Sequence, residues 1–379
     1  MKITKVETFV LSNELKESFF FSQWAYSERR ICVVKISTDI GVVGWGEGYG
    51  PADVISAGIK ILVPLLIGKN PIEQETIWHE MYRRTLDYAR RGVLAASISA
   101  VDVALWDIKG RALNLPVSVL MGGQHRTKVM PYATGLYFSQ SNKLSEKLAE
   151  EAKSYVEQGF RAIKMKVGYS IKEDIKHVKA VREAIGNDVK LMVDANHAYS
   201  LREAAELARQ IETYNIGWFE EPVSPEFYHH YKELRTKTAI PITGGECEYL
   251  RYGFQQLLAN DCVDILQVDI CGAGGLTEAK RIATLASTRG IELIPHVWGT
   301  GIAFHAALHF IANLEPVPGR LLSPDFYIEY DRTENGIRES LTAPEIKMEN
   351  GFIEIPQRPG LGIEVNEDVL HQYSTEILV

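Results

Sequence analysis

The sequence predicts an α/β fold in which a TIM-type (β/α) barrel follows a small N-terminal α+β domain. The first 50 residues contain short runs of alternating apolar and polar residues, and helical spacing follows to about residue 110. From about Val129, β-rich runs alternate with amphipathic stretches, as in parallel strands joined by crossover helices. With 379 residues, 46% of them hydrophobic, the chain is long enough for a barrel and an accessory domain.

The first domain begins with three runs that resemble strands, KITKVETFVL, ICVVKISTD and VVGWGEG. The DIG segment, Asp39 to Gly41, predicts a turn between the second and third runs, as in an antiparallel meander. The later segment AASISAVDVALWDIKG has apolar residues at helical spacing, which predicts a helix ending at Gly110.

Seven runs are the candidate barrel strands: VMPYATG, RAIKMKVG, KLMVDANH, GWFEEPV, IPITGGE, VDILQVDI and ELIPHVWG. Between them lie helical segments such as SEKLAEEAKSYVEQG, each with an apolar stripe and a charged face. Seven or eight strand–helix units in about 220 residues predict the barrel. The last 30 residues, rich in Pro and Gly, predict a tail that packs back on the first domain.

Composition argues against several classes of partner. The formal net charge is -8, and Lys and Arg are scattered rather than clustered, so we expect no nucleic-acid partner. There is neither a signal-like N-terminus nor an uncharged apolar run of 18 residues, which predicts a cytoplasmic protein without a membrane partner. The four cysteines, Cys32, Cys247, Cys262 and Cys271, form no C-x-x-C pair and are interpreted as reduced thiols.

The candidate strands end in residues that can carry chemistry, roughly 25 residues apart, about one barrel unit. They are Lys164 and Lys166, then Asp194, Glu220, Glu246, Asp269 and His296. Barrel enzymes carry their active sites at the C-terminal ends of the strands. We therefore expect these side chains to converge on one pocket.

Three acids on successive strands, Asp194, Glu220 and Glu246, supply the oxygen ligands that Mg²⁺ prefers. Taken singly, each is better explained as a solvated carboxylate or a local salt bridge, but the repeated position at strand ends favours a metal site. Asn196 and Glu221 are candidates for groups that orient these ligands or pair with a lysine, and a purely structural role is equally compatible with the sequence.

Lys164 and Lys166 are two residues apart on one strand, so both face the barrel interior. A buried ammonium beside another cation loses its proton more easily, which makes such a lysine a candidate general base. Across the pocket, Asp269 and His296 end adjacent strands and predict a hydrogen-bonded pair that supplies a second acid/base group.

Two further segments carry weaker signals. CGAGGLT follows a strand, but Thr277 occupies the place of the third glycine of a dinucleotide loop, so we reject a nicotinamide cofactor. The aromatic stretch at residues 18–30 is too polar for a core strand. With GEGYGP, residues 46–51, it predicts either lids over the barrel mouth or a subunit contact.

Taken together, these motifs resemble the enolase superfamily, and within it the mandelate racemase subgroup of the mandelate racemase/muconate lactonizing enzyme family. The matching segments are AASISAVDVALWDIKG, VDAN, FEEP, GGE and PHVWGTG, and the resemblance covers essentially the whole chain. It implies a modified (β/α)7β barrel at residues 126–345, an α+β capping domain at 1–125 and a C-terminal segment at 346–379 that packs on the capping domain.

The same resemblance implies site roles: Mg²⁺ on Asp194, Glu220 and Glu246, Lys166 and His296 as the acid/base pair, and Lys164 and Asp269 as groups that tune them. Glu329, in IEYDRT, matches more loosely the glutamate that faces the substrate carboxylate. The family also implies a homo-oligomer.

The implied reaction is removal of the proton next to a carboxylate, through a metal-stabilised enediolate. DANHAYS, WFEEPVSPE and HVWGTGI are most similar to D-galactarolactone cycloisomerases and acid-sugar dehydratases, so the first hypothesis is β-elimination from a sugar acid or its lactone. A racemase or epimerase acting with the same residues is the alternative, and a catalytically silent metal-binding scaffold is the second alternative.

Overall fold

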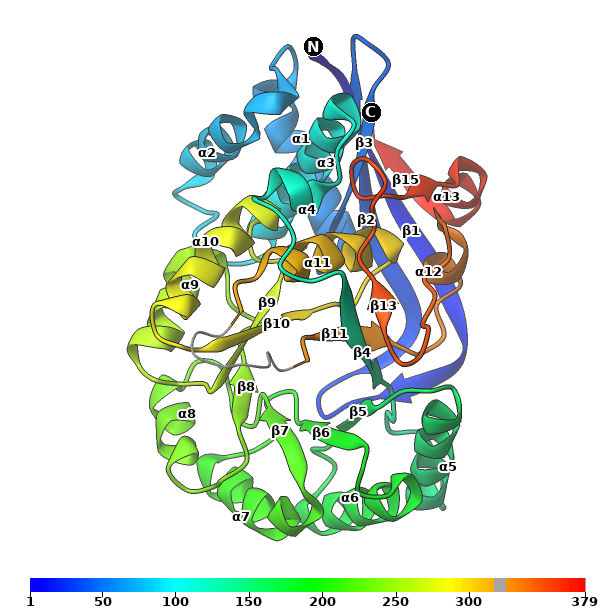
Figure 1. The fold of residues 1–379 in the computed structure, drawn as a ribbon, viewed down its shortest axis with the longest axis vertical. Helices are drawn as coiled ribbons and strands as arrows, with labels where there is room; N and C mark the ends of the chain where they lie inside the picture. The colour runs from blue at the N-terminus through cyan, green and yellow to red at the C-terminus, as the bar shows by residue number, and fades with distance from the viewer. Residues whose placement is uncertain (317–324, 379) are drawn as a thin grey trace.

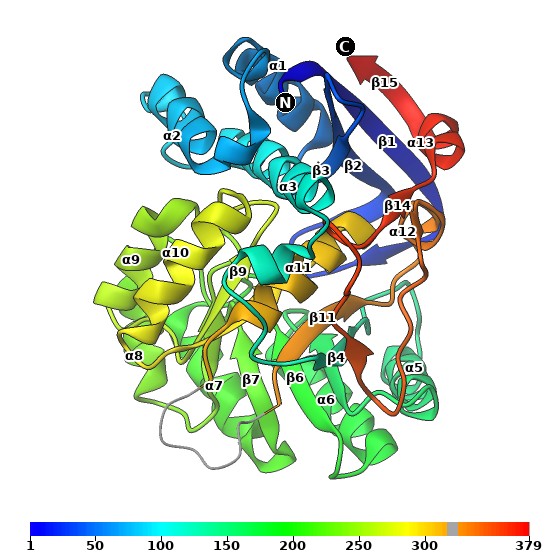
Figure 2. The same cartoon turned by 45° about the horizontal axis from the view of Figure 1, so that its top comes forward.

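An antiparallel sheet opens the chain. In the computed structural model, which describes residues 1–316 and 325–378, strands β1 (Ile3–Phe20), β2 (Ala25–Thr38) and β3 (Val43–Gly48) pair in that order. The turn between β2 and β3 contains the DIG segment, so the predicted meander is confirmed. Strand β15 (Ser374–Leu378), near the end of the chain, pairs with the other edge of β1, and Figure 2 shows the two side by side.

Helices α1 (Ala52–Leu66) and α3 (Val93–Leu113) pack on this sheet. A 3₁₀ turn at Pro71–Glu73 and α2 (Gln74–Thr85) lie between them in the chain, and the short α4 (Val117–Leu120) follows α3. Helix α3 is buried for most of its length between the sheet and the barrel (Figure 2). Gly46 permits this contact, because a Cβ there would lie 1.9 Å from the carbonyl oxygen of Ala100.

Helix α3 runs past the predicted end at Gly110 and stops at Leu113, where Asn114 takes the left-handed conformation of a C-cap. Gly110 has another role. The C-terminal segment crosses α3 so closely there that a Cβ would lie 2.5 Å from the Cα of Gly360. The glycine therefore marks a close approach of two backbone segments, which sequence alone does not distinguish from a helix end.

Within the described residues, eight parallel strands form the curled sheet of the barrel: β4 (Lys128–Thr134), β5 (Ala162–Lys166), β6 (Lys190–Asp194), β7 (Ile216–Glu220), β8 (Ile242–Gly244), β9 (Ile265–Asp269), β10 (Glu292–His296) and β11 (Tyr327–Asp331). Pairing follows chain order from β4 to β10, and β11 pairs with β4. Strand β11, in the IEYDRT stretch, completes the (β/α)7β pattern, and Figure 1 shows the sheet curling round.

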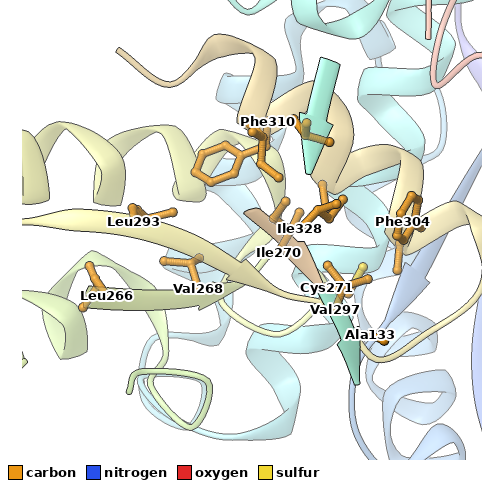
Figure 3. Close-up of a cluster of buried hydrophobic side chains, with 14 of the residues drawn as sticks. Ala133, Leu266, Val268, Ile270, Cys271, Leu293, Val297, Phe304, Phe310 and Ile328 are labelled. Atoms are coloured by element: carbon orange, nitrogen blue, oxygen red, sulfur yellow. The ribbon is translucent and has the colours of Figure 1, made fainter. Parts of the chain in front are cut away.

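Seven helices link successive strands: α5 (Leu144–Glu157), α6 (Ile171–Ile185), α7 (Leu201–Ile211), α8 (Tyr228–Arg235), α9 (Leu250–Ala259), α10 (Gly275–Ser287) and α11 (Gly301–Asn313). Capping residues in the sequence mark where several of these helices begin. In α7, for example, Ser200 and Glu203 form a capping box. Helix α11 is buried on all sides, and Figure 3 shows Phe304 and Phe310 of this helix against β9, β10 and β11. No described helix is long and apolar enough to cross a membrane.

The remaining short elements are a 3₁₀ turn at Glu212–Tyr214, α12 (Gly336–Ser340), β12 (Thr342–Ala343), β13 (Ile353–Glu354), β14 (Glu364–Val365) and α13 (Glu367–Tyr373). This C-terminal run passes from the barrel, where β13 pairs with β4, to the first sheet, where β15 pairs with β1 (Figure 1). The boundaries proposed at residues 125 and 345 stay predictions.

Residues 18–30 are mostly strand rather than loop, because β1 and β2 extend as a two-stranded ribbon beyond the rest of their sheet. Cross-strand pairs such as Phe19 with Tyr26 continue the ribbon to its tip, where residues Phe21–Trp24 connect the two strands. The tip reaches the barrel, where Ser22 Oγ and Gln23 Nε2 donate hydrogen bonds of 2.9 and 2.7 Å to the carbonyl oxygen of Asn196.

Candidate active site

Strand register brings the chemical groups to one end of the barrel. Lys166 on β5 pairs with Asp194 on β6, and Asp194 pairs in turn with Glu220 on β7. On the other side, Asp269 on β9 pairs with His296 on β10. All five are the last residues of their strands, so regular parallel pairing places them at the same level of the barrel.

The two lysines are paired with carboxylates. Lys166 Nζ lies 2.5 Å from Asp194 Oδ2 and donates a 2.8 Å hydrogen bond to Asn196 Oδ1. Lys164 Nζ contacts Glu220 Oε1, lies 2.9 Å from Glu329 Oε1 and 3.6 Å from Asp194 Oδ2. Several carboxylates therefore converge on one ammonium group in a fully buried position.

The sequence led us to expect a lysine with a lowered pKa, and the structure differs. Burial is the largest single effect and lowers the pKa of Lys166, as does the neighbouring Lys164, but Asp194 and Glu246 together outweigh them, so the pKa lies above its usual value. Burial likewise lowers the pKa of Lys164, and Glu220 and Glu329 raise it well above its usual value. The surrounding carboxylates therefore favour the ammonium form of both lysines.

The imidazole on the opposite side is also paired. His296 Nδ1 and Asp269 Oδ2 lie 2.6 Å apart, and the exposed fraction of each side chain is 4%. Burial lowers the pKa of His296, but Glu246, Glu329 and Asp269 raise it to about 10. These carboxylates therefore favour the imidazolium form, in which Nδ1 can donate to Asp269 and Nε2 lies on the side of Glu246 and Glu329.

Glu246 and Glu329 connect the two sides. His296 Nε2 lies 3.5 Å from Glu246 Oε2 and 3.9 Å from Glu329 Oε2. Glu329 is anchored by Thr134 Oγ1, which donates a 2.6 Å hydrogen bond, and by the backbone N–H of Val297 at 3.0 Å. The loosely matched Glu329 thus lies within this cluster, between Lys164 and His296.

Asn196 and Glu221 differ in their surroundings. Asn196 accepts from Lys166, and its backbone N–H donates to Asp194 Oδ1 at 3.0 Å, so it contacts a lysine and a predicted metal ligand. Glu221 is turned to the other side of its strand end, where its Oε2 lies 3.2 Å from His197 Nε2. Of these two residues, Asn196 has the expected contact with a lysine, whereas the ion pair described for Glu221 is with His197.

The donor set of Asp194, Glu220 and Glu246 fits Mg²⁺ chemically, since it consists of carboxylates alone and two of them converge on Lys164. The carboxylate oxygens of these three residues do not all lie within 4.8 Å of one another, so they are further apart than the ligand atoms of one ion. Among residues 1–316 and 325–378, the one set of three candidate ligand atoms lying within 4.8 Å of one another is His197, Glu221 and Cys247. Asp194 and Glu220 each contact a lysine instead, and the magnesium ligands stay a prediction.

Several residues of this cluster were missed from the sequence. Thr134 ends β4, so the strand-end rule that found the others also applied to it. Trp218 Nε1 donates to Glu220 Oε2 at 2.9 Å from two residues earlier on the same strand. Tyr49, whose ring lies 5.0 Å from the His296 ring, belongs to the GEGYGP segment, for which the sequence predicted a lid or a subunit contact. Tyr137, whose ring lies 5.0 Å from Lys166 Nζ, comes from a loop without a sequence signal.

A buried cluster of carboxylates with a lysine on one side and a histidine on the other lies at the C-terminal ends of barrel strands, beneath a separate α+β layer. This arrangement is typical of a (β/α)-barrel enzyme with an attached capping domain. The comparisons with known proteins specify the class further.

The chain belongs to the mandelate racemase/muconate lactonizing enzyme family of the enolase superfamily, as the sequence predicted. Residues 5–122 match the family model described as "Mandelate racemase / muconate lactonizing enzyme, N-terminal domain", and residues 147–369 match "Enolase C-terminal domain-like". Its relatives include a cycloisomerase and a dehydratase, so the prediction that the chain is an enzyme is confirmed.

Three relatives are similar over nearly the whole chain. D-Galactarolactone cycloisomerase of Agrobacterium fabrum is 41% identical over 98% of this chain and 99% of its own. Arabinonate dehydratase of Saccharolobus solfataricus is 38% identical over 95% of both. The crystal structure of the 3,6-anhydro-D-galactonate cycloisomerase from Zobellia galactanivorans has a TM-score of 0.91 and 55% identity, covering 99% of this chain and 100% of that one.

Proposed function

We propose that this chain is a Mg²⁺-dependent enzyme that removes the proton next to the carboxylate of a sugar acid and expels the β oxygen. The observation that carries the proposal is the pair of acid/base groups, Lys166 and His296, held by Asp194 and Asp269 on separate sides of one buried cluster. Such a pair can take a proton from one carbon and deliver one to a leaving oxygen.

The metal would be held by Asp194, Glu220 and Glu246. When bound, Mg²⁺ offsets the negative charge that develops on the substrate carboxylate. A metal on Asp194 would offset the carboxylate charge that raises the pKa of Lys166. The lower pKa would favour the neutral amine, which is the form that a general base requires. Glu329, anchored by Thr134, is proposed to face the substrate carboxylate.

The 55% identity to an anhydro-sugar cycloisomerase favours a cyclic substrate. In a 3,6-anhydrohexonate, removal of the C2 proton and cleavage of the C3–O bond open the ring, and the released oxygen takes up a proton. The enol formed becomes a 2-keto-3-deoxy acid. The sum is an isomerisation without loss of water, so the product keeps the mass of the substrate, whereas dehydration of an open-chain sugar acid lowers it by one water.

Mass spectrometry of product mixtures tests this proposal. Purified protein with Mg²⁺ would be incubated with 3,6-anhydro-D-galactonate, D-galactarolactone and D-arabinonate in D₂O, and 2-keto acids trapped as semicarbazones. A keto acid of unchanged carbon skeleton that carries deuterium at C3 supports elimination. Deuterium exchange at C2 without a keto product would instead establish the racemase or epimerase alternative.

Two controls exclude the silent scaffold. Chelation of divalent ions should abolish turnover, and Mg²⁺ should restore it. Lys166→Ala and His296→Asn should each lower turnover by about 10²–10⁴-fold. Turnover that survives chelation and both substitutions, or no turnover of any of the three acids, contradicts the proposal.

We also propose, as the sequence led us to expect, that the protein is a homo-oligomer that acts in the cytoplasm on small molecules, without a nucleic-acid or membrane partner. Its four cysteines are free thiols.

A further inference from the structure

A second cluster of possible metal ligands lies beside the predicted magnesium ligands. His197, Glu221 and Cys247 follow the C-terminal ends of β6, β7 and β8. His197 Nε2 lies 3.2 Å from Glu221 Oε2 and 3.6 Å from Cys247 Sγ, and the three ligand atoms all lie within 4.8 Å of one another. This spacing matches atoms that share the coordination sphere of one ion, since zinc bonds to nitrogen, oxygen and sulfur are about 2.0–2.3 Å long.

Backbone pairing fixes two of these residues relative to each other. The N–H of His197 donates to the carbonyl oxygen of Glu221 at 2.8 Å, and the N–H of Glu221 donates to Thr243 O at 2.9 Å. His197 and Glu221 have φ angles of 68° and 40°, in the left-handed region that residues other than glycine rarely occupy. The strand ends therefore present both side chains from a defined backbone geometry.

Glu221 has an unsatisfied acceptor within the cluster. Only 1% of the residue is exposed, and its Oε2 makes no hydrogen bond of good geometry within the described residues, although His197 Nε2 lies 3.2 Å away and the Cys247 thiol interacts with the same carboxylate. A buried carboxylate with so little hydrogen bonding is costly, and coordination of a cation reduces that cost. This oxygen is the one that faces His197 Nε2.

The cluster is accessible from outside the barrel. Cys247 is exposed and lines a cavity of about 280 Å³ together with Glu226, Tyr228, Glu248 and Tyr249. An ion can therefore reach the sulfur from solvent without passing the buried lysines.

We propose that His197, Glu221 and Cys247 bind a divalent ion of the zinc class, separate from the predicted magnesium site. One imidazole, one carboxylate and one thiolate with a remaining position for water is a ligand set that Zn²⁺ and Co²⁺ favour. Mg²⁺ prefers oxygen ligands and has little affinity for sulfur. When the ion binds, the sulfur–metal bond replaces the thiol proton, which is released to solvent.

Cobalt is a spectroscopic probe for this site. Full-length protein saturated with Mg²⁺ would be titrated with Co²⁺, and a near-ultraviolet thiolate-to-cobalt charge-transfer band should appear with one equivalent of metal. Excess Zn²⁺ should remove the band. Cys247→Ser should abolish it, whereas Cys262→Ser, a change of a cysteine outside the cluster, should leave it intact.

The other ligands are tested by affinity. His197→Asn, chosen because asparagine tolerates positive φ, and Glu221→Gln should each weaken Co²⁺ binding by about 10–100-fold. Asp194→Asn, which alters a predicted magnesium ligand, should keep the band, so the test separates this site from the proposed catalytic function.

Three results overturn the proposal: no charge-transfer band in the wild type, a band that survives Cys247→Ser, or equal Co²⁺ affinity in the wild type and the His197 and Glu221 variants. Circular dichroism of each variant shows whether it folds. If Cys247→Ser fails to fold, Glu221→Gln decides the outcome, because it keeps the thiol and the shape of the side chain.

Discussion

At the C-terminal ends of β6, β7 and β10 the barrel interior is charged, and two residues earlier on these three strands it is apolar. Asp194 and His296 belong to the site, whereas Met192 and Ile294 lie in a buried cluster with Trp218. Residues two apart on a strand face the same side, so both sets point into the barrel. One interior thus has a reactive end and a packed end, and we expect substitutions at the two ends to affect different properties.

The packed end also contains a lysine, which makes the comparison direct. Lys190 begins β6, and its Nζ lies 4.4 Å from the ring centroid of Tyr327 and 5.3 Å from that of Trp218. Burial lowers its pKa. Lys166 is held by a 2.5 Å contact with Asp194 Oδ2, whereas Lys190 packs on two aromatic rings and the more distant Glu292 only partly offsets the effect of burial on its pKa.

The largest contrast is expected between these two lysines. Lys166→Ala should lower kcat by about 10²–10⁴-fold, because it removes a proposed acid/base group. Lys190→Ala should leave kcat nearly unchanged, because it lies at the end of the barrel opposite the site. Steady-state kinetics on a turned-over sugar acid measures both. Equal losses would show that the division between the two ends is wrong.

The next largest effect is expected in stability at the packed end. Met192 is fully buried, and Met192→Ala should lower the free energy of unfolding by about 2–5 kcal/mol through lost packing and a residual cavity. Urea denaturation measures this loss. Met348→Ala, which truncates a half-buried methionine of the C-terminal segment, is the control and should cost clearly less. An effect no larger than the control's would mean that the packed end is loosely filled.

A smaller effect is expected at Asp269, which positions His296. Asp269→Asn keeps the size of the side chain but replaces the charged acceptor of the 2.6 Å contact, and kcat should fall by about 10²-fold. The pH dependence of kcat should also change, which a purely structural role does not require. Asp264→Asn, just before the same strand at its other end, is the control and should keep both kcat and the pH profile.

The sequence predicted the fold and the strand-end residues well because both depend on local regularities. One strand, loop and helix per barrel unit carries Asp194, Glu220 and Asp269 to the same level, so their order in the chain predicts their convergence. The same rule applied to Thr134, which was overlooked because threonine is common at strand ends and carries no charge.

Contacts between distant segments could not be predicted. Gly110 was interpreted as a helix end, although the backbone at Gly360, far along the chain, requires a glycine there. From the sequence, CGAGGLT was rejected as a dinucleotide-binding loop, and no other role was predicted for it. In the structure, Asp102 of α3 accepts hydrogen bonds from the backbone N–H and the hydroxyl of Thr277, so the segment joins the first domain to the barrel.

The smallest expected effect tests whether the two ends are independent. Trp218 packs edge-on against Tyr132, with ring centroids 5.3 Å apart, and its Nε1 donates to Glu220 Oε2 at 2.9 Å, so it links the packed end to a predicted metal ligand. Trp218→Phe keeps a ring but removes the donor, a loss of about 1 kcal/mol, or about fivefold in an equilibrium constant. We expect the Mg²⁺ concentration for half-maximal activity to change by about that factor, measured by metal titration of turnover. Tyr327→Phe, which alters a neighbouring ring without a bond to Glu220, is the control. If Trp218→Phe changes only the free energy of unfolding, the packed end does not influence the metal ligands through this bond.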